Sequence, residues 1–182
     1  VQIQRLRAWM ARLAELPWRW LGPVAYATAL AEQRVHRQGI LDGSRPEEIW
    51  LLEHDPVVTL GKRGAEGVDK AARAAAGIPV VQTERGGLAT YHGPGQLVVY
   101  PLVNLTARGW GVRAFVQALE AEVMAWLAEL GVEAGRRSGA PGVWVQGYKI
   151  AAVGLHIRRG VSAHGLSLNL ATPLGPYGHF VP

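Results

Sequence analysis

The chain of 182 residues contains no cysteine. Disulfide bonds and thiolate metal sites are therefore excluded among these residues, and so is a secreted domain held together by disulfides. Lysine is scarce as well, because Lys62, Lys70 and Lys149 are the only three while Lys and Arg together number 19. The formal net charge is +5, and a basic surface of this kind favours an acidic partner.

Long apolar runs are missing too. Residues 20–31 form the longest charge-free stretch near the N-terminus, and they are too few for a transmembrane helix, which needs about 20 apolar residues. No apolar signal-peptide core exists either, because the first twenty positions are interrupted by Arg5, Arg7, Arg12, Glu15 and Arg19. We therefore expect a cytoplasmic protein that does not associate with membranes.

Basic residues do not gather into a run. Arg136–Arg137 and Arg158–Arg159 are isolated pairs, and no aromatic side chains alternate with them as a nucleic-acid platform would require. We expect no nucleic-acid partner. The four arginines are instead candidate contacts for an acidic protein.

The spacing of apolar residues predicts strands mixed with a few helices. Helical periodicity covers residues 3–13 and 112–130. A further helix is expected from Pro23 toward Ile40, because proline suits the first helical position, and a short alanine-rich one over residues 68–76. Apolar runs bounded by turn residues predict strands over residues 49–53, 57–60, 78–82, 97–105, 142–145, 148–157 and 166–170. This mixture is typical of a single α+β or α/β domain.

Residues 85–96 form the first candidate site. Four glycines and Pro94 fall within this segment, which predicts irregular backbone. Glycine allows backbone N–H groups to converge on a ligand oxygen, such as the oxyanion that forms during acyl transfer. No Gly-Lys-Ser/Thr follows, and the glycine spacing does not match a dinucleotide fingerprint. The alternative is a plain hairpin connection.

Lys149 is the second candidate. It precedes the apolar run 150–155, where partial desolvation would lower its pKa and free it for proton transfer. The alternative is a lysine at a strand end that reaches solvent along its apolar stem.

Histidines are the third group. His54, His92, His156 and His164 lie in or beside apolar segments, with His92 in the glycine segment and His164 before Gly165 in an expected turn. None has a paired metal-binding spacing, so we expect no metal site. Neither Ser138 nor Ser167 lies in a Gly-x-Ser-x-Gly elbow.

Taken together, these segments resemble the lipoyl(octanoyl) transferase family. The resemblance keeps its order over roughly residues 20–182 and rests on Arg85-Gly86-Gly87, Thr90 to Leu97, Tyr100-Pro101, Glu53-His54 with Pro56, Val57, Thr59 and Gly61, Lys149-Ile150-Ala151 with Gly154, His164-Gly165, and Leu168-Asn169-Leu170. We therefore expect residues 1–20 to form a basic, helical N-terminal extension and residues 21–182 to form the catalytic domain.

The resemblance implies a fold and a reaction. The fold would be an α+β single domain with a mixed central sheet flanked by helices, as in lipoate and biotin protein ligases. The reaction would move an octanoyl or lipoyl group from acyl carrier protein to a lysine of a lipoyl domain, the first step of endogenous protein lipoylation. The acceptors would be E2 subunits of 2-oxoacid dehydrogenases and the glycine cleavage H protein. The route is a cysteine thioester, and no cofactor, ATP or metal is required.

The resemblance also implies roles for particular residues. Lys149 corresponds to the lysine that lowers the pKa of the nucleophilic thiol. The acyl-binding positions correspond to Arg85, Gly86, Gly87, Leu88, Ala89, Thr90, Tyr91, His92, Ala152, Val153, Gly154, Gly165, Leu166 and Ser167. Leu88 departs from the polar residue that the family pattern has there. The family cysteine follows a proline, so we expect the nucleophile directly after Pro182, in a C-terminal segment beyond the printed sequence.

Two other readings remain open at this point. An ATP-dependent lipoate or biotin protein ligase shares the fold and needs no cysteine, although the segment from Tyr91 to Gln96 argues against it. A non-catalytic module that binds acyl carrier protein or lipoyl domains is the second alternative.

Overall fold

The computed structural model describes residues 15–64 and 77–179. Its centre is a seven-stranded sheet in the order β1-β2-β6-β10-β9-β8-β7. The strands are β1 (Trp18–Pro23), β2 (Glu48–Glu53), β6 (Gln96–Leu102), β7 (Gly135–Arg137), β8 (Ala140–Val145), β9 (Tyr148–Arg158) and β10 (Val161–Asn169). β1 and β2 are parallel and every other pair in this sheet is antiparallel, so the sheet is mixed.

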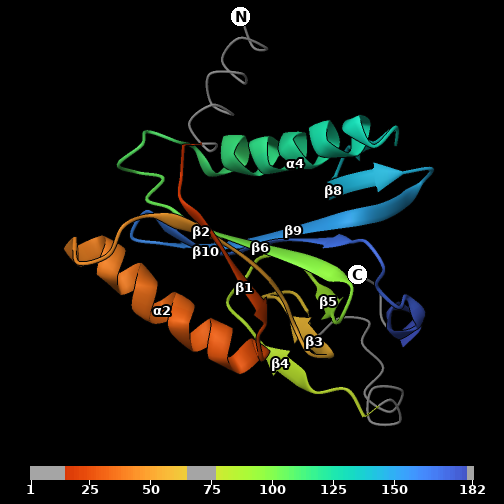
Figure 1. The fold of residues 1–182 in the computed structure, drawn as a ribbon, viewed down its shortest axis with the longest axis horizontal. Helices are drawn as coiled ribbons and strands as arrows, with labels where there is room; N and C mark the ends of the chain where they lie inside the picture. Colours follow the sequence, from red (N-terminus) through yellow and green to blue (C-terminus); the bar gives the residue numbers. More distant parts are fainter. Residues whose placement is uncertain (1–14, 65–76, 180–182) are drawn as a thin grey trace, which may run out of the picture.

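A smaller sheet and two helices complete the domain. The small sheet has the order β4-β3-β5, formed by β3 (Val57–Leu60), β4 (Val80–Gln82) and β5 (Ala89–His92). Helix α2 (Tyr26–Asp42) covers one face of the large sheet and α4 (Val112–Glu129) covers the other (Figure 1). A single 3-10 turn, η1 (Gly175–His179), follows β10 among the described residues. The expected α+β domain with a mixed, helix-flanked sheet is confirmed.

Strand β6 has apolar side chains on both of its faces because each face packs beneath one of the two helices. Val98, Tyr100 and Leu102 pack in a cluster with Ala29 of α2, whereas Leu97 and Val99 contact the core beneath α4. A strand covered on both faces needs apolar side chains at odd and even positions alike. Burial on both faces therefore explains the apolar run from which this strand was predicted.

Helix α4 was predicted best. Its apolar face, which includes the fully buried Phe115, packs on the sheet, and the helix ends at Glu129 as expected from Gly131, whose φ of 74° is costly for other residues. The strand over residues 57–60 is also confirmed, as β3.

Three predictions need correction. Residues 18–23 form strand β1, so Pro23 ends a strand and α2 starts at Tyr26. This strand includes the last residues of the expected helical extension, because the parallel pairing of Trp18 with Ile49 supplies backbone partners. Residues 89–92, expected to be irregular, form β5, because Thr90 and its neighbours pair with β3.

The third correction concerns His164 and Gly165, which lie inside β10 and not in a turn. His164 has a φ of 58°, and its backbone N–H donates to Gln33 Oε1 of α2 at 2.7 Å. A Cβ on Gly165 would lie 2.7 Å from Pro101 Cδ and closer still to the Val99 carbonyl oxygen. The glycine is therefore required by the close approach of β6.

One further strand was not predicted, and two predicted helices cannot be compared with the structure. The three-residue strand β7 was not predicted, and the helices expected over residues 3–13 and 68–76 lie outside the described residues. Within the described part of the chain, no helix combines the length and hydropathy needed to cross a membrane.

Candidate active site

A cavity of about 680 Å³ lies between the glycine segment, β5 and strands β9 and β10. All fourteen acyl-binding positions named from the resemblance line it except Tyr91, and Lys149 lines it as well. Tyr91 instead packs in a hydrophobic cluster with Val58 of β3. Segments 60 to 80 residues apart in the sequence thus meet at one cavity.

Strand register explains how the segments meet. Gly154 of β9 pairs with Gly165 of β10, and Ala152 pairs with Ser167. The glycine segment lies against β9 because the Gly86 N–H donates to the Leu155 carbonyl at 3.0 Å. Both glycines line the cavity, and each allows a close neighbour to occupy the place where a side chain would stand.

Arg85 fastens the glycine segment to the small sheet. Its Nη2 donates to the Thr59 carbonyl at 2.7 Å and to Thr59 Oγ1 at 2.9 Å, and its Nη1 donates to the Gly86 carbonyl at 3.0 Å. A Cβ on Gly154 would stand 3.2 Å from Arg85 Cδ. Burial lowers the pKa of Arg85, and its hydrogen bonds all go to neutral oxygens. These contacts make Arg85 a support of the cavity wall.

His92 is neutral in the folded protein. Burial, followed by repulsion from His54, lowers the pKa of His92 to about 3. Its Nδ1 lies 2.7 Å from Gln96 Oε1, and Gln96 Nε2 donates to the Tyr91 carbonyl at 3.0 Å. Because the amide oxygen accepts, His92 carries its proton on Nδ1 and presents Nε2 as an acceptor.

His54 and Tyr100 form a second buried pair. His54 Nδ1 donates to the Val24 carbonyl at 2.7 Å, so its Nε2 accepts from the Tyr100 hydroxyl, also at 2.7 Å. Burial raises the pKa of Tyr100 well above its usual value. The hydroxyl therefore stays protonated and the histidine stays in one tautomer.

Two buried hydroxyls on the cavity wall stand out. Tyr26 Oη and Thr90 Oγ1 are buried and have no hydrogen-bond partner in the described part of the chain. Burial raises the pKa of Tyr26 to about 12, so it remains a donor. An unpaired buried hydroxyl is costly, which makes both groups available to a polar atom of a bound ligand.

His164 is neutral like His92. Burial, followed by the charge of Arg85, lowers the pKa of His164 to about 4. Its Nε2 lies 3.9 Å from Glu84 Oε2, a distance at which a neutral imidazole makes no ion pair. His164 thus contributes an uncharged side chain to the cavity wall.

Lys149 supplies an amine to the cavity. It is the second residue of β9 and pairs with Trp144 of β8, and its Nζ lies 5.2 Å from the centre of the Trp144 ring. Burial lowers the pKa of Lys149, and no described carboxylate forms an ion pair with it. An amine with a lowered pKa and no fixed counter-ion exchanges protons more readily than a surface lysine.

Several cavity residues were missed from the sequence. Tyr26, Trp144 and Tyr177 line the cavity, yet none has a local sequence signal. Asn169 also lines it and lies in the quoted Leu168-Asn169-Leu170 segment, although no role was given to it. Tyr100 does lie in the quoted Tyr-Pro pair, although no role was given to it. In the described chain no three His, Cys, Asp or Glu residues are grouped to hold a metal ion.

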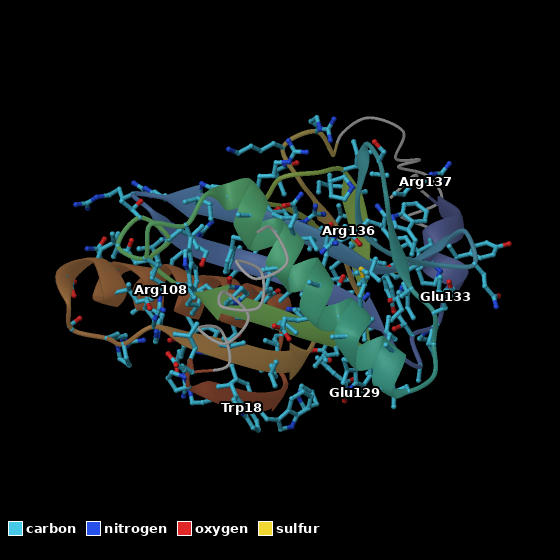
Figure 2. The ribbon with its side chains drawn as sticks, turned by 90° about the horizontal axis from the view of Figure 1, so that it is seen from above. Trp18, Arg108, Glu129, Glu133, Arg136 and Arg137 are labelled. Atoms are coloured by element: carbon cyan, nitrogen blue, oxygen red, sulfur yellow. The ribbon has the colours of Figure 1, made fainter. Side chains whose placement is uncertain are left out.

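The four candidate arginine contacts differ in availability. Arg136 lies beside α4 (Figure 2), where its Nε donates to Glu120 Oε2 at 2.7 Å. Arg137 stacks over Trp144 with 5.2 Å between the guanidinium carbon and the ring centre. The charge of Arg136 is therefore already paired, whereas Arg158 and Arg159 are exposed.

Comparisons with known proteins identify the family of the chain. The model of the lipoyl protein ligase A/B catalytic domain matches residues 25–182. The chain is 48% identical over 162 residues to an octanoyltransferase of Azoarcus sp., covering 89% of this chain and 70% of that protein. It is 46% identical over 170 residues to an octanoyltransferase of Thiobacillus denitrificans, covering 90% and 73%.

Solved structures share the fold at low identity. A lipoate-protein ligase A bound with ATP superposes with a TM-score of 0.74 at 19% identity, covering 92% of this chain and 72% of that chain. A bipartite lipoate protein ligase from Thermoplasma acidophilum, described with its E2 lipoyl domain, gives a TM-score of 0.65 at 20% identity, covering 92% and 66%.

Proposed function

The chain belongs to the lipoyl protein ligase A/B catalytic-domain family, and from that premise we propose that it is an octanoyltransferase. Curated octanoyltransferases are 44% to 48% identical to it over most of its length. One observation in the structure carries the proposal further. The Lys149 amine and the paired segments of β9 and β10 line the same cavity.

The proposed donor is octanoyl-acyl carrier protein and the proposed acceptor is a lysine of a lipoyl domain. The cavity wall offers small or apolar side chains where an acyl chain would lie, at Ala152, Val153, Gly154 and Leu166. The net charge of +5 suits an acidic carrier. A lipoate ligase described with its lipoyl domain shares the fold, which is consistent with the same class of acceptor.

The proposed nucleophile is a cysteine directly after Pro182. That position lies outside the described residues, but Tyr177 lines the cavity and its hydroxyl donates to the Tyr91 carbonyl at 3.1 Å. A residue six positions further on lies within roughly 20 Å of Tyr177. Chain length therefore allows the nucleophile to reach the cavity that Lys149 lines.

The reaction proceeds by two acyl exchanges. In the first, Lys149 accepts the thiol proton, the thiolate attacks the thioester carbonyl, and the bond to the carrier sulfur breaks as that sulfur regains a proton. In the second, the acceptor amine attacks the enzyme thioester, an amide forms, and the cysteine leaves as a thiolate while the amine proton is lost. The proposed role of Lys149 is to pass the thiol proton to the departing carrier sulfur in the first exchange and to accept the proton that the amine loses in the second.

Intact mass tests the proposal. Protein with a cysteine after Pro182 should gain one octanoyl group from octanoyl-acyl carrier protein, and hydroxylamine should remove it, since thioesters are cleaved by hydroxylamine. The 182-residue form should gain none. A hydroxylamine-labile adduct on the short form would identify a different nucleophile.

The same samples separate the alternatives. A lipoate or biotin protein ligase would instead form an acyl-adenylate from ATP and the free acid, without any acyl carrier protein. A binding module without catalysis would bind acyl carrier protein but form neither the adduct nor the amide.

A further inference from the structure

Glu120 is a carboxylate on the otherwise apolar inner face of α4. It is 4% exposed and lies among Phe115, Leu119 and Val123. A buried carboxylate is unfavourable unless hydrogen bonds satisfy it. The two oxygens of Glu120 therefore need partners, and both partners lie in the β7–β8 hairpin.

One oxygen binds the backbone of β8. The Gly142 N–H donates to Glu120 Oε1 at 2.8 Å in a buried contact. Arg136 Nε donates to the other oxygen at 2.7 Å, and Arg136 Nη2 also donates to the Gln117 carbonyl of α4 at 2.5 Å. Glu120 thus ties α4 to both strands of the hairpin.

Gly142 lies directly against Lys149. Its φ of 127° suits glycine alone, and a Cβ there would stand 3.3 Å from Lys149 Cδ and overlap the Ala151 carbonyl oxygen. The stem of Lys149 therefore runs along the Gly142 backbone. The position of that backbone, which Glu120 holds, limits where the stem can lie.

A bulge follows immediately in the β8–β9 ladder. Val143 pairs with Ala151 but Trp144 pairs with Lys149, so the register shifts between the two pairs and Ile150 is the extra residue. Bulges redirect side chains and are frequent beside active sites. This one sets Lys149 opposite Trp144, with Nζ 5.2 Å from the ring centre.

We propose that Glu120 is a positioning residue for Lys149: its carboxylate holds the Gly142 amide, and through Gly142 it fixes the bulge that directs the Lys149 side chain into the cavity. The inference deepens the proposed function, since it rests on the role given there to Lys149. The residue that acts here is about thirty positions away in sequence and has no part in the quoted family motifs.

Two substitutions separate position from charge. Glu120→Gln keeps the length of the side chain and an oxygen acceptor for the Gly142 N–H, but removes the charge. Glu120→Asp keeps the charge and withdraws the carboxylate by one methylene. If Glu120 acts by position, the Asp variant is the damaging one. The matched control is Glu129→Gln, at the exposed far end of the same helix (Figure 2).

The primary readout is the titration of Lys149 itself. Because the chain has only three lysines, ¹³C-lysine NMR of the 182-residue protein should resolve each Cε signal, with Lys149→Arg identifying the one of interest. The Lys149 signal should titrate below the ordinary lysine pKa in the wild type, in Glu120→Gln and in Glu129→Gln. In Glu120→Asp its pKa should move toward that ordinary value.

Transfer kinetics are the second readout. In protein carrying the cysteine, Glu120→Asp should lower kcat by roughly 100-fold with KM for the acyl donor unchanged.

The titration decides the proposal. It is overturned if Glu120→Gln shifts the pKa of Lys149 and Glu120→Asp does not, or if neither variant shifts it. Should Glu120→Asp fail to fold, a shifted Lys149 signal in folded Glu120→Gln still overturns it, and an unshifted one supports it. Absence of transfer by the wild type would refute the proposed function, while the titration still decides this inference.

Discussion

The contact of β10 with β6 at Gly165 makes a quantitative prediction about stability. A Cβ added to Gly165 would lie 2.7 Å from Pro101 Cδ and nearer still to the Val99 carbonyl oxygen. One neighbour is a proline ring and the other is backbone, so neither rotates away. Overpacking of this kind costs about 1–3 kcal/mol, and the rigidity of both neighbours places Gly165→Ala near the upper end.

This loss of stability should appear as a measurable decrease in the midpoint of thermal unfolding, Tm. One kcal/mol moves Tm by roughly 2–4 °C for a chain of this size, so Gly165→Ala should lower Tm by about 6–12 °C in thermal unfolding followed by far-UV circular dichroism. Gly135→Ala is the matched control, because a Cβ on this strand glycine meets nothing within 4 Å. Its Tm should stay level or rise slightly, since alanine reduces the entropy of the unfolded chain. A Gly165→Ala midpoint equal to that of the control would refute the packing argument.

Three further predictions concern the cavity. Lys149→Met, in protein with the cysteine, should lower the transfer rate by roughly 10²–10⁴-fold with little change in Tm; near-normal turnover would make Lys149 structural. Donors carrying C4, C8 and C16 chains should be used unequally, with C8 best, since each buried methylene adds about 0.8 kcal/mol until the cavity is full; a flat profile would contradict an acyl-binding cavity. Stability should fall below about pH 6.5, because the unfolded state protonates His92 and His164 while their folded pKa values are about 3 and about 4. The lowered pKa of each histidine should reduce the free energy of unfolding by about 2 kcal/mol at pH 5. The Tm at pH 5 should therefore lie well below the Tm at pH 7.5, and His92→Gln should reduce this difference.

Elements with a regular apolar pattern were predictable. Helix α4 matches the expected range to within a residue at each end, because its periodicity reflects a continuous contact with one sheet face. The same reasoning failed for β5. Its flanking glycines indicated irregular backbone, whereas pairing with β3 imposes a strand on residues 89–92. The position of a partner strand cannot be predicted from local composition.

The site was predictable only where a motif marks it. The glycine segment and Lys149 could be named from the sequence, and both line the cavity. Glu120 could not, because its role depends on the hairpin that folds back against α4. The one local clue was a carboxylate on an apolar helical face. Such a residue is expected to be buried with a partner, although its partner is not readable from the pattern.

Strand β1 bears on where the autonomously folding unit begins. The family match starts at residue 25, just past the end of β1 at Pro23. A fragment trimmed to that boundary would turn β2 into an edge with unpaired backbone groups and would leave the buried Glu48 without Arg19, whose Nη2 lies 2.7 Å away. Leu16, only 5% exposed, would also be lost from the core. A fragment that keeps both β1 and the packing of Leu16 therefore begins no later than Leu16, and a cut after residue 20 would divide a strand.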